Sequence, residues 1–255
     1  IAGVALDHDG LVPEALSAVC KRYRPKVLFC MPNLHSPTTS TMTEERRHKI
    51  AALARKHDFW IVQDDVYGAY LENPLLPFRA IAPERSIFFT SFSKVVALGA
   101  SVGFISVPQD LRDQISSNIR IAGATAAPIF CEAITQWMDE GRLDEIILAN
   151  RVEIAARAAI ARSILGDAGL VSRPNSPHAW LPLPASTSLS DFMIRVQHHG
   201  IKLMRSDQFA VEHPLQTRAG VRISLGGAPN RTILTDALTK IKHILHLAST
   251  ETPMT

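Results

Sequence analysis

The amino-acid sequence predicts an α/β fold in which a mostly parallel sheet is followed by a smaller α+β domain. In the first hundred residues, short apolar runs alternate with helical patterns, which is typical of βαβ units around a buried parallel sheet. After Gly166 the pattern changes to short strands and two further helices. We therefore expect a boundary near this residue, with one domain over 1–165 and a second over 166–255.

The first domain is expected to contain four strands and one clearly marked helix. The strands are predicted at 27–31, 59–63, 86–90 and 103–107. Thr43 is a residue type that often caps a helix N-terminus, and Glu44 and Glu45 follow it in the first turn, where acidic side chains are favourable. Apolar residues at helical spacing follow, and the helix is predicted to end at 56–58.

The rest of the chain is predicted to be helical at first and then mixed. From about Asp110 to Leu165 the pattern is mainly helical, with breaks near 126–128 and at Gly141, and its last helix is long enough to join two lobes. The second domain is expected to contain a strand at 178–183, a helix at 188–199, short strands near 201–204 and 221–225, and a last helix from about 230 to 247.

Composition excludes several classes of protein. The 255 residues are 46% hydrophobic and 20% charged, which fits neither disorder nor collagen nor coiled coil. The 27 basic residues are scattered along the chain, so nucleic-acid binding by this chain is not expected. No apolar run approaches the length of a membrane helix, and the three cysteines are far apart. We therefore expect a cytoplasmic protein, without membrane contact. Because the chain begins at Ile1, we also expect that an upstream segment is missing.

Polar residues follow three of the predicted strands, and these are candidate site residues. Lys94 comes just after the third strand, where partial desolvation would favour a neutral amine that can condense with a carbonyl group. The alternative is a lysine on a surface loop. Asp64 and Tyr67 follow the second strand, at the edge where open α/β sheets bind ligands. The alternative for them is a capping aspartate beside a core tyrosine. No metal site is expected, because paired His and Cys spacings are absent from the sequence.

Several sequence strings resemble known motifs in their order and spacing. PNLHSPTTSTMTEERR from Pro32, IVQDDVYGAYL from Ile61 and FFTSFSKVVALGASVGF from Phe88 resemble fold-type-I pyridoxal-phosphate (PLP) aminotransferases. PHAWLPLP from Pro177, SDQFAVEHP from Ser206 and GVRISLGGAPNRTILTDAL from Gly220 resemble the aminotransferase-like domain of MocR-type regulators in the GntR family. The resemblance covers nearly the whole chain but begins about a third of the way into that domain. It implies that 1–165 is the C-terminal part of the large PLP-binding domain, including a connecting helix, and that 166–255 is the small domain.

The resemblance also implies roles for individual residues. Lys94 matches the lysine that forms a Schiff base with PLP, Asp64 the partner of the pyridine nitrogen, and Tyr67 the partner of the 3-oxygen. Ser91 matches a hydroxyl that binds the phosphate. Arg222 matches the arginine that binds a substrate carboxylate through two parallel hydrogen bonds. Asp65 is then a bystander or a structural residue.

Two departures from the family pattern predict weaker cofactor binding. Ser36 stands where the family usually has the asparagine of Asn-Pro-Thr-Gly, so a shorter hydroxyl replaces the amide near the 3-oxygen. The string Leu98-Gly99-Ala100-Ser101 stands where the family usually has Pro-Gly-Leu-Arg, which removes an arginine that pairs with the phosphate. Such a contact is worth about tenfold to a hundredfold in affinity. In the family, the upstream segment that we expect to be missing here also supplies cofactor contacts, so the resemblance implies that PLP binding is weak or absent in this chain.

Three functions remain open at this point. The first is a regulatory effector domain that binds PLP and an amino-acid-like molecule, as in MocR-type regulators, with DNA bound only through a missing N-terminal domain. The second is an active aminotransferase, in which Lys94 also moves a proton. The third is a scaffold without cofactor. The resemblance implies a homodimer in each case.

Overall fold

The computed structural model describes residues 1–96, 99, 101–211 and 219–250. The chain divides into two compact units, which are described separately. The N-terminal unit comprises Val4–His35 and Ser40–Arg151, and the C-terminal unit comprises Ile1–Gly3, Ser36–Thr39 and Val152–Thr255. The division falls inside a long helix, and a domain boundary near residue 165 stays a prediction.

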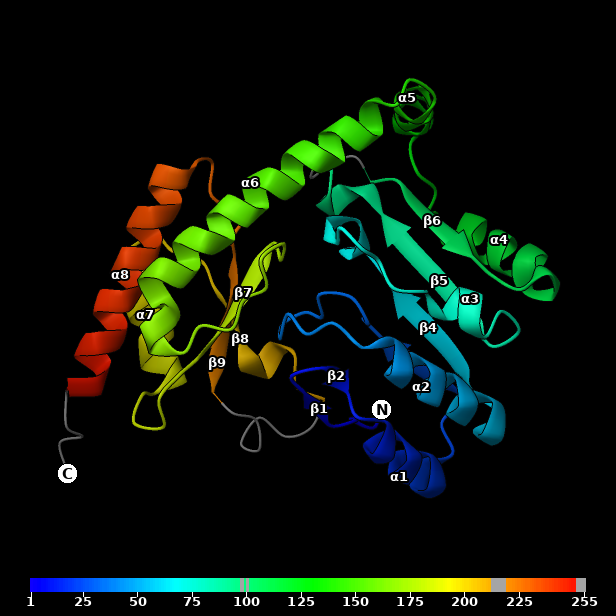
Figure 1. Cartoon of the computed structure of the whole chain (residues 1–255), viewed down its shortest axis with the longest axis horizontal. Helices are drawn as coiled ribbons and strands as arrows, with labels where there is room; N and C mark the ends of the chain where they lie inside the picture. Colours follow the sequence, from blue (N-terminus) through cyan, green and yellow to red (C-terminus); the bar gives the residue numbers. More distant parts are fainter. Residues whose placement is uncertain (97–98, 100, 212–218, 251–255) are drawn as a thin grey trace. The chain divides into compact units, whose positions relative to one another are not determined.

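The N-terminal unit is built on a four-stranded sheet with the order β3-β4-β5-β6 (Figure 1). Its strands are β3 (Val27–Cys30), β4 (Trp60–Asp64), β5 (Ser86–Ser91) and β6 (Gly103–Ser106). The first three are parallel, whereas β6 is antiparallel to β5. The expected four strands and the mostly parallel sheet are therefore confirmed.

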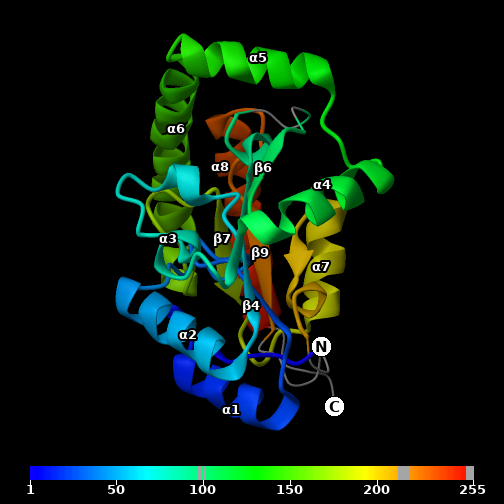
Figure 2. The same ribbon diagram turned by 90° about the vertical axis from the view of Figure 1, so that its right-hand side faces the viewer.

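Three helices cover one face of this sheet: α1 (Pro13–Tyr23), α2 (Glu44–His57) and α3 (Phe78–Ile81) (Figures 1 and 2). The Thr43 hydroxyl accepts a hydrogen bond from the Arg46 amide over 3.4 Å, which confirms the predicted N-cap of α2. Asp58 ends the helix in a left-handed conformation. The core between helices and sheet contains Leu16, Cys20, Leu28, Cys30, Ile50, Ala51, Ala54, Phe59, Ile61 and Phe78.

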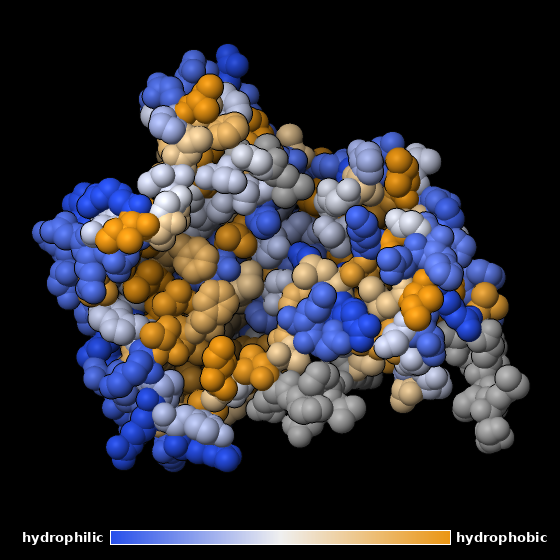
Figure 3. All heavy atoms as spheres, turned by 180° about the vertical axis from the view of Figure 1, so that it is seen from behind, coloured by the Kyte–Doolittle hydropathy of each residue, from blue (hydrophilic) through white to orange (hydrophobic). Residues whose placement is uncertain are grey.

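The opposite face of the sheet is apolar and partly exposed. In β3 the buried residues alternate with exposed ones, and Phe29 is 59% exposed. The register places Phe29 beside Val62, and its ring lies 6.4 Å from that of Phe89 on β5, which pairs with exposed Ile105 on β6. Figure 3 shows apolar side chains gathered on this side of the molecule. Sheets with parallel strands usually have both faces covered, so one face of this sheet is unusually open.

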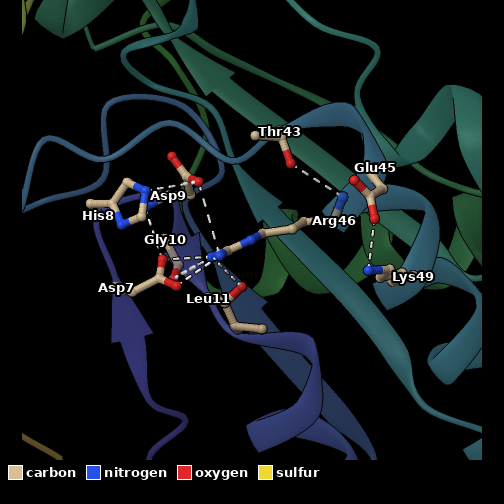
Figure 4. Close-up of polar contacts among 9 residues, drawn as sticks. All are labelled: Asp7, His8, Asp9, Gly10, Leu11, Thr43, Glu45, Arg46 and Lys49. Atoms are coloured by element: carbon tan, nitrogen blue, oxygen red, sulfur yellow. Dashed lines mark hydrogen bonds and ion pairs between the residues drawn. The ribbon is translucent and has the colours of Figure 1, made fainter.

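A short hairpin of β1 (Leu6–Asp7) and β2 (Gly10–Leu11) precedes α1 and was not predicted. Arg46 on α2 holds this hairpin through two hydrogen bonds to the Asp7 carboxylate, at 2.6 and 2.7 Å, and one to the Gly10 carbonyl (Figure 4). Hydrogen bonding to Arg46 lowers the pKa of Asp7 to about 2.

The predicted helical region contains α4 (Arg112–Ile121), α5 (Pro128–Asp139) and α6 (Arg142–Leu165), with the expected breaks between them. Helix α6 supplies residues to both units. One-turn 3-10 helices occur at η1 (Gly68–Tyr70), η2 (Phe92–Lys94) and η3 (Gln109–Leu111). In the described ranges, no helix has both the length and the apolar character that crossing a membrane requires.

The C-terminal unit has a three-stranded antiparallel sheet with the order β7-β9-β8. Its strands and helices are β7 (His178–Pro182), α7 (Leu189–His198), β8 (Met204–Arg205), β9 (Gly220–Ser224) and α8 (Arg231–Thr250). These elements match the predicted ones within a few residues. The core joins the sheet to three helices through Ala158, Ala161, Leu165, Leu181, Phe192, Val196, Val221, Leu238 and Ile241.

Candidate functional site

Four of the predicted site residues lie in the N-terminal unit, at the C-terminal ends of β4 and β5 or just after them. The two strands are parallel neighbours, with Asp64 paired to Phe89. Asp64 therefore ends β4, with Tyr67 just after it, at the same edge where Ser91 ends β5 and Lys94 follows. Burial raises the pKa of Asp64, and the Val66 amide, 3.1 Å from its carboxylate, and the positive charge of Lys94 oppose that rise. The Lys94 ammonium thus lies within electrostatic range of the Asp64 carboxylate.

Lys94 is the last residue of η2 and is exposed. The expectation of a partly desolvated ammonium is therefore wrong for the chain as described, because η2 leaves this side chain at the surface. The amine is accessible to a small molecule. Tyr67, in contrast, is buried in the turn after β4.

The Ser91 hydroxyl caps η2. It accepts a hydrogen bond from the Ser93 amide over 3.2 Å and lies 3.2 Å from the Val102 carbonyl oxygen, to which it can donate. This capping fixes the start of the short helix that carries Lys94. A role of Ser91 toward a phosphate stays a prediction.

Asp65 is the centre of a buried polar network. The Asn33 side-chain amide donates to its carboxylate over 2.6 Å, and the fully buried Arg47 donates to the Asn33 side-chain oxygen over 2.5 Å. Burial raises the pKa of Asp65 and lowers that of Arg47, and the opposite charge of each opposes the shift of the other. Arg47 also donates to the Leu76 carbonyl over 3.0 Å. Asp65 therefore has the structural role that was one of its two predicted roles: it fixes the turn that follows Asp64.

Gly68 is required by this turn because the Asp65 carboxylate lies directly against it. A Cβ atom at position 68 would lie 2.6 Å from the Asp65 Cγ and 2.8 Å from its Oδ1, and closer still to Oδ2. These separations are shorter than any van der Waals contact. The glycine in the Asp64–Gly68 string is thus a packing requirement of the network.

Tyr70 is a site residue that the sequence reasoning missed. Its buried phenol donates a hydrogen bond to the Lys94 carbonyl oxygen over 2.7 Å. The only signal in the sequence is a second tyrosine three residues after Tyr67. That spacing does not distinguish a site residue from a core tyrosine.

The other two predicted residues belong to the C-terminal unit. Ser36 begins the segment Ser36–Thr39, in which Thr39 occupies the position of the family glycine and has a φ of 63°. Arg222 lies on β9 opposite Trp180 and Met204, with its Nη1 3.3 Å from the Met204 sulfur. The grouping of all six residues in one site stays a prediction. Leu98 and Ala100 lie outside the described residues, whereas Ser101 is exposed.

In the described ranges, no three or more histidine, cysteine, aspartate or glutamate side chains gather in a group that could hold a metal ion. The side chains at this edge of the sheet are an accessible amine, a half-buried carboxylate, a phenol and a hydroxyl. That combination suits a ligand with an aldehyde and a basic ring nitrogen.

Comparison with known proteins agrees with this chemistry. The profile of the family "Aminotransferase class I and II" matches residues 6–241. The uncharacterized HTH-type transcriptional regulator YdeF of Bacillus subtilis is 25% identical over 225 residues, which are 88% of this chain and 48% of YdeF. The mitochondrial kynurenine/alpha-aminoadipate aminotransferase of Bos taurus is 30% identical over 161 residues, 56% of this chain and 38% of that protein.

A solved structure supports the same conclusion for the fold. LysN, an alpha-aminoadipate aminotransferase from Thermus thermophilus complexed with N-(5'-phosphopyridoxyl)-L-leucine, superposes with a TM-score of 0.84 at 19% identity. The superposition covers 96% of this chain and 65% of LysN. This chain thus spans about half the length of YdeF and about two thirds of LysN.

The fold is that of the fold-type-I PLP-dependent transferases, with a mixed sheet and a smaller α+β unit. The chain belongs to the aminotransferase class I and II family, and it is similar to HTH-type regulators of the GntR/MocR kind as well as to aminotransferases. Both the predicted fold class and the predicted resemblance are confirmed.

Proposed function

We propose that this chain is part of an aminotransferase-like effector domain that binds PLP at Lys94 and belongs to a GntR/MocR-type transcriptional regulator. The observation that carries the proposal is the placement of Asp64 and Lys94 at the C-terminal ends of two neighbouring parallel strands, Asp64 as the last residue of β4 and Lys94 in η2 directly after β5. The similarity to YdeF, which extends over 88% of the chain, supports the regulatory part.

The residues of the N-terminal unit fit PLP in their chemistry. The Lys94 amine would hold the aldehyde as an imine, the Asp64 carboxylate would keep the pyridine nitrogen protonated, and the Tyr67 phenol would donate to the 3-oxygen. When bound, PLP supplies an electron sink for bonds at the α-carbon of an amino compound. The half-buried state of Asp64 supports its assignment, since a desolvated carboxylate is stabilised by a cationic partner.

The phosphate side of the site is less complete. Ser91 is the remaining candidate for binding the phosphate, because Ser101 stands where the family has an arginine. Ser36 is the candidate near the 3-oxygen. A charged hydrogen bond to phosphate contributes about tenfold to a hundredfold in affinity. We therefore expect this chain to bind PLP weakly.

The regulatory output would arise from a change in conformational equilibrium. A ligand shifts such an equilibrium only by its difference in affinity for the two states. An amino-acid-like effector would compete with Lys94 for PLP, and Arg222 stays the candidate for binding its carboxylate that the family resemblance implies. In the full-length regulator, a homodimer would pass this change to an N-terminal DNA-binding domain in the cytoplasm.

The alternative function is an active PLP-dependent aminotransferase. The 30% identity with the bovine aminotransferase supports it. In that case Lys94, once released from PLP, would act as the base that moves the proton at the substrate α-carbon. Ser36 and Ser101, in place of the family asparagine and arginine, argue against full activity.

A spectroscopic titration tests the proposal. PLP is added to the chain and to its Lys94→Ala and Lys26→Ala variants, and the visible imine band is followed. We expect a band in the unaltered chain and in Lys26→Ala, which lacks an exposed lysine outside the site, and none in Lys94→Ala. Reduction with borohydride followed by peptide mapping should place the label on Lys94. A label spread over surface lysines would refute the proposal, and turnover that depends on a 2-oxo acid would favour the alternative.

A further inference from the structure

The carbonyl groups at the end of η2 are held by side chains from two other elements of the N-terminal unit. Carbonyl groups in the last turn of a helix have no partner within the helix and need donors from elsewhere. The Tyr70 phenol, on η1, donates to the Lys94 carbonyl over 2.7 Å, and the Asn150 amide, on α6, donates to the Val95 carbonyl over 2.8 Å. The backbone that carries Lys94 is therefore fixed at two successive carbonyl groups.

The surroundings of Tyr70 suit it to this role. The residue is 4% exposed, and burial, together with the neighbouring Tyr67, raises its pKa to about 12. The phenol therefore keeps its proton, and remains a donor, throughout the neutral pH range. Arg151, next to Asn150 on α6, donates to the Ala69 carbonyl over 2.7 Å and holds η1 itself. Both turns at the site are thus attached to the same part of α6.

We propose that Tyr70 is a positioning residue for Lys94: its hydrogen bond to the Lys94 carbonyl fixes the direction in which the exposed amine projects from η2. The inference rests on the proposed function, in which this amine binds PLP. The side chain of Lys94 is long and flexible, so its reach is set by where its backbone is held. The Asp64 carboxylate, which the proposed function pairs with the pyridine nitrogen, accepts a hydrogen bond from the Val66 amide. Without Tyr70, the Lys94 amine and the Asp64 carboxylate would keep their chemistry, but their positions relative to one another would no longer be fixed.

The first measurement requires no cofactor. The amides of Val95 and Val96 donate to the Phe92 carbonyl, at 3.1 and 2.8 Å, so their hydrogen exchange reports the opening of η2. In Tyr70→Phe we expect these two amides to exchange about tenfold faster, the factor that corresponds to one hydrogen bond. Amides within α2 should keep their rates. Tyr23→Phe, which alters an exposed tyrosine on α1, is the matched control and should change neither set.

The second measurement uses PLP as the probe. The dissociation constant of PLP, taken from the visible imine band, should rise roughly tenfold in Tyr70→Phe and stay unchanged in Tyr23→Phe. Asn150→Ala, which frees the next carbonyl, should act in the same direction in both measurements and replaces Tyr70→Phe if that variant does not fold.

The outcomes separate the inference from the proposed function. Unchanged exchange at Val95 and Val96 in Tyr70→Phe would overturn the inference, and so would faster exchange with unchanged PLP affinity, since Tyr70 would then be only a structural residue. A chain that forms no imine at Lys94 would overturn the proposed function and with it the link to PLP, while the exchange rates would still decide whether Tyr70 holds η2.

Discussion

Replacing Gly68 with alanine should destabilise the N-terminal unit, because Gly68 lies directly against the Asp65 carboxylate. The added methyl group would overlap the Asp65 side chain, whose three outer atoms are the nearest atoms to it. That carboxylate is not free to move away, because its Oδ1 accepts the 2.6 Å hydrogen bond from Asn33, and Asn33 is bonded to the buried Arg47. The substitution must therefore either shift the backbone or break the network.

The size of the effect follows from these contacts. Overpacking costs about 1–3 kcal/mol, and losing a hydrogen bond to a charged group costs about 1.5–3 kcal/mol. Alanine also lowers the conformational entropy of the unfolded chain, which offsets about 0.4–1 kcal/mol of this loss of stability. We expect Gly68→Ala to lower the free energy of unfolding by about 2–5 kcal/mol in urea denaturation. Gly166→Ala is the control, since a Cβ there meets open space, and it should stay within about 0.5 kcal/mol.

A double-mutant cycle shows whether Asp65 is the cause. In an Asp65→Ala background the carboxylate is absent, so Gly68→Ala should cost less than about 1 kcal/mol. If Gly68→Ala is as stable as the unaltered protein, or if its cost is the same in both backgrounds, the packing argument is wrong.

Three further substitutions test other parts of the structure. Thr39→Gly should raise the free energy of unfolding by about 1 kcal/mol, because a φ of 63° is strained for a β-branched residue and the buried hydroxyl makes no hydrogen bond within the described part of the chain; an unchanged thermal midpoint would contradict this. Arg47→Met should lower the unfolding free energy by about 3–5 kcal/mol, since it removes the cation from a buried network; the exposed Arg22→Met is its control, and equal urea midpoints for the two variants would refute the expectation. Burial lowers the pKa of His35 from 6.5 to about 4, so the unfolded chain binds a proton that the folded chain does not. Stability should therefore fall as the pH falls from 6.5 to 4, by up to about 1.4 kcal/mol per pH unit, and His35→Gln should reduce that slope; identical slopes would count against it.

Much of the fold could be predicted because its signals are local. The Thr43 cap, the acidic first turn and the apolar spacing all lie within one segment, and they predicted α2 nearly to the residue. The positions of strands β3 to β6 were also predicted to within a few residues. The antiparallel direction of β6 was not predicted, because direction depends on how the chain returns after η2 and not on the composition of the strand.

The candidate site could be predicted only in part, for a related reason. Lys94, Asp64 and Tyr67 were found from their positions after strands and from the family resemblance. The contacts that hold them depend on pairs far apart in the sequence: Asn33 with Asp65 are 32 residues apart, and Tyr70 with Lys94 are 24 apart. A single sequence gives no sign of such pairs. It also left open whether Lys94 would be partly desolvated or exposed on a surface loop, since exposure depends on which elements surround η2.

Chemical labelling of the cysteines in the core of the N-terminal unit can report the unfolding of this unit. Cys20 and Cys30 are buried, and burial raises both of their pKa values, that of Cys30 to about 12. The thiolate is the nucleophile that reacts with alkylating reagents, so these two residues should resist alkylation while the unit is folded. Cys131 on α5 is partly exposed and should react first. The later, slower labelling would then measure how often the sheet separates from its helices, without any added fluorophore.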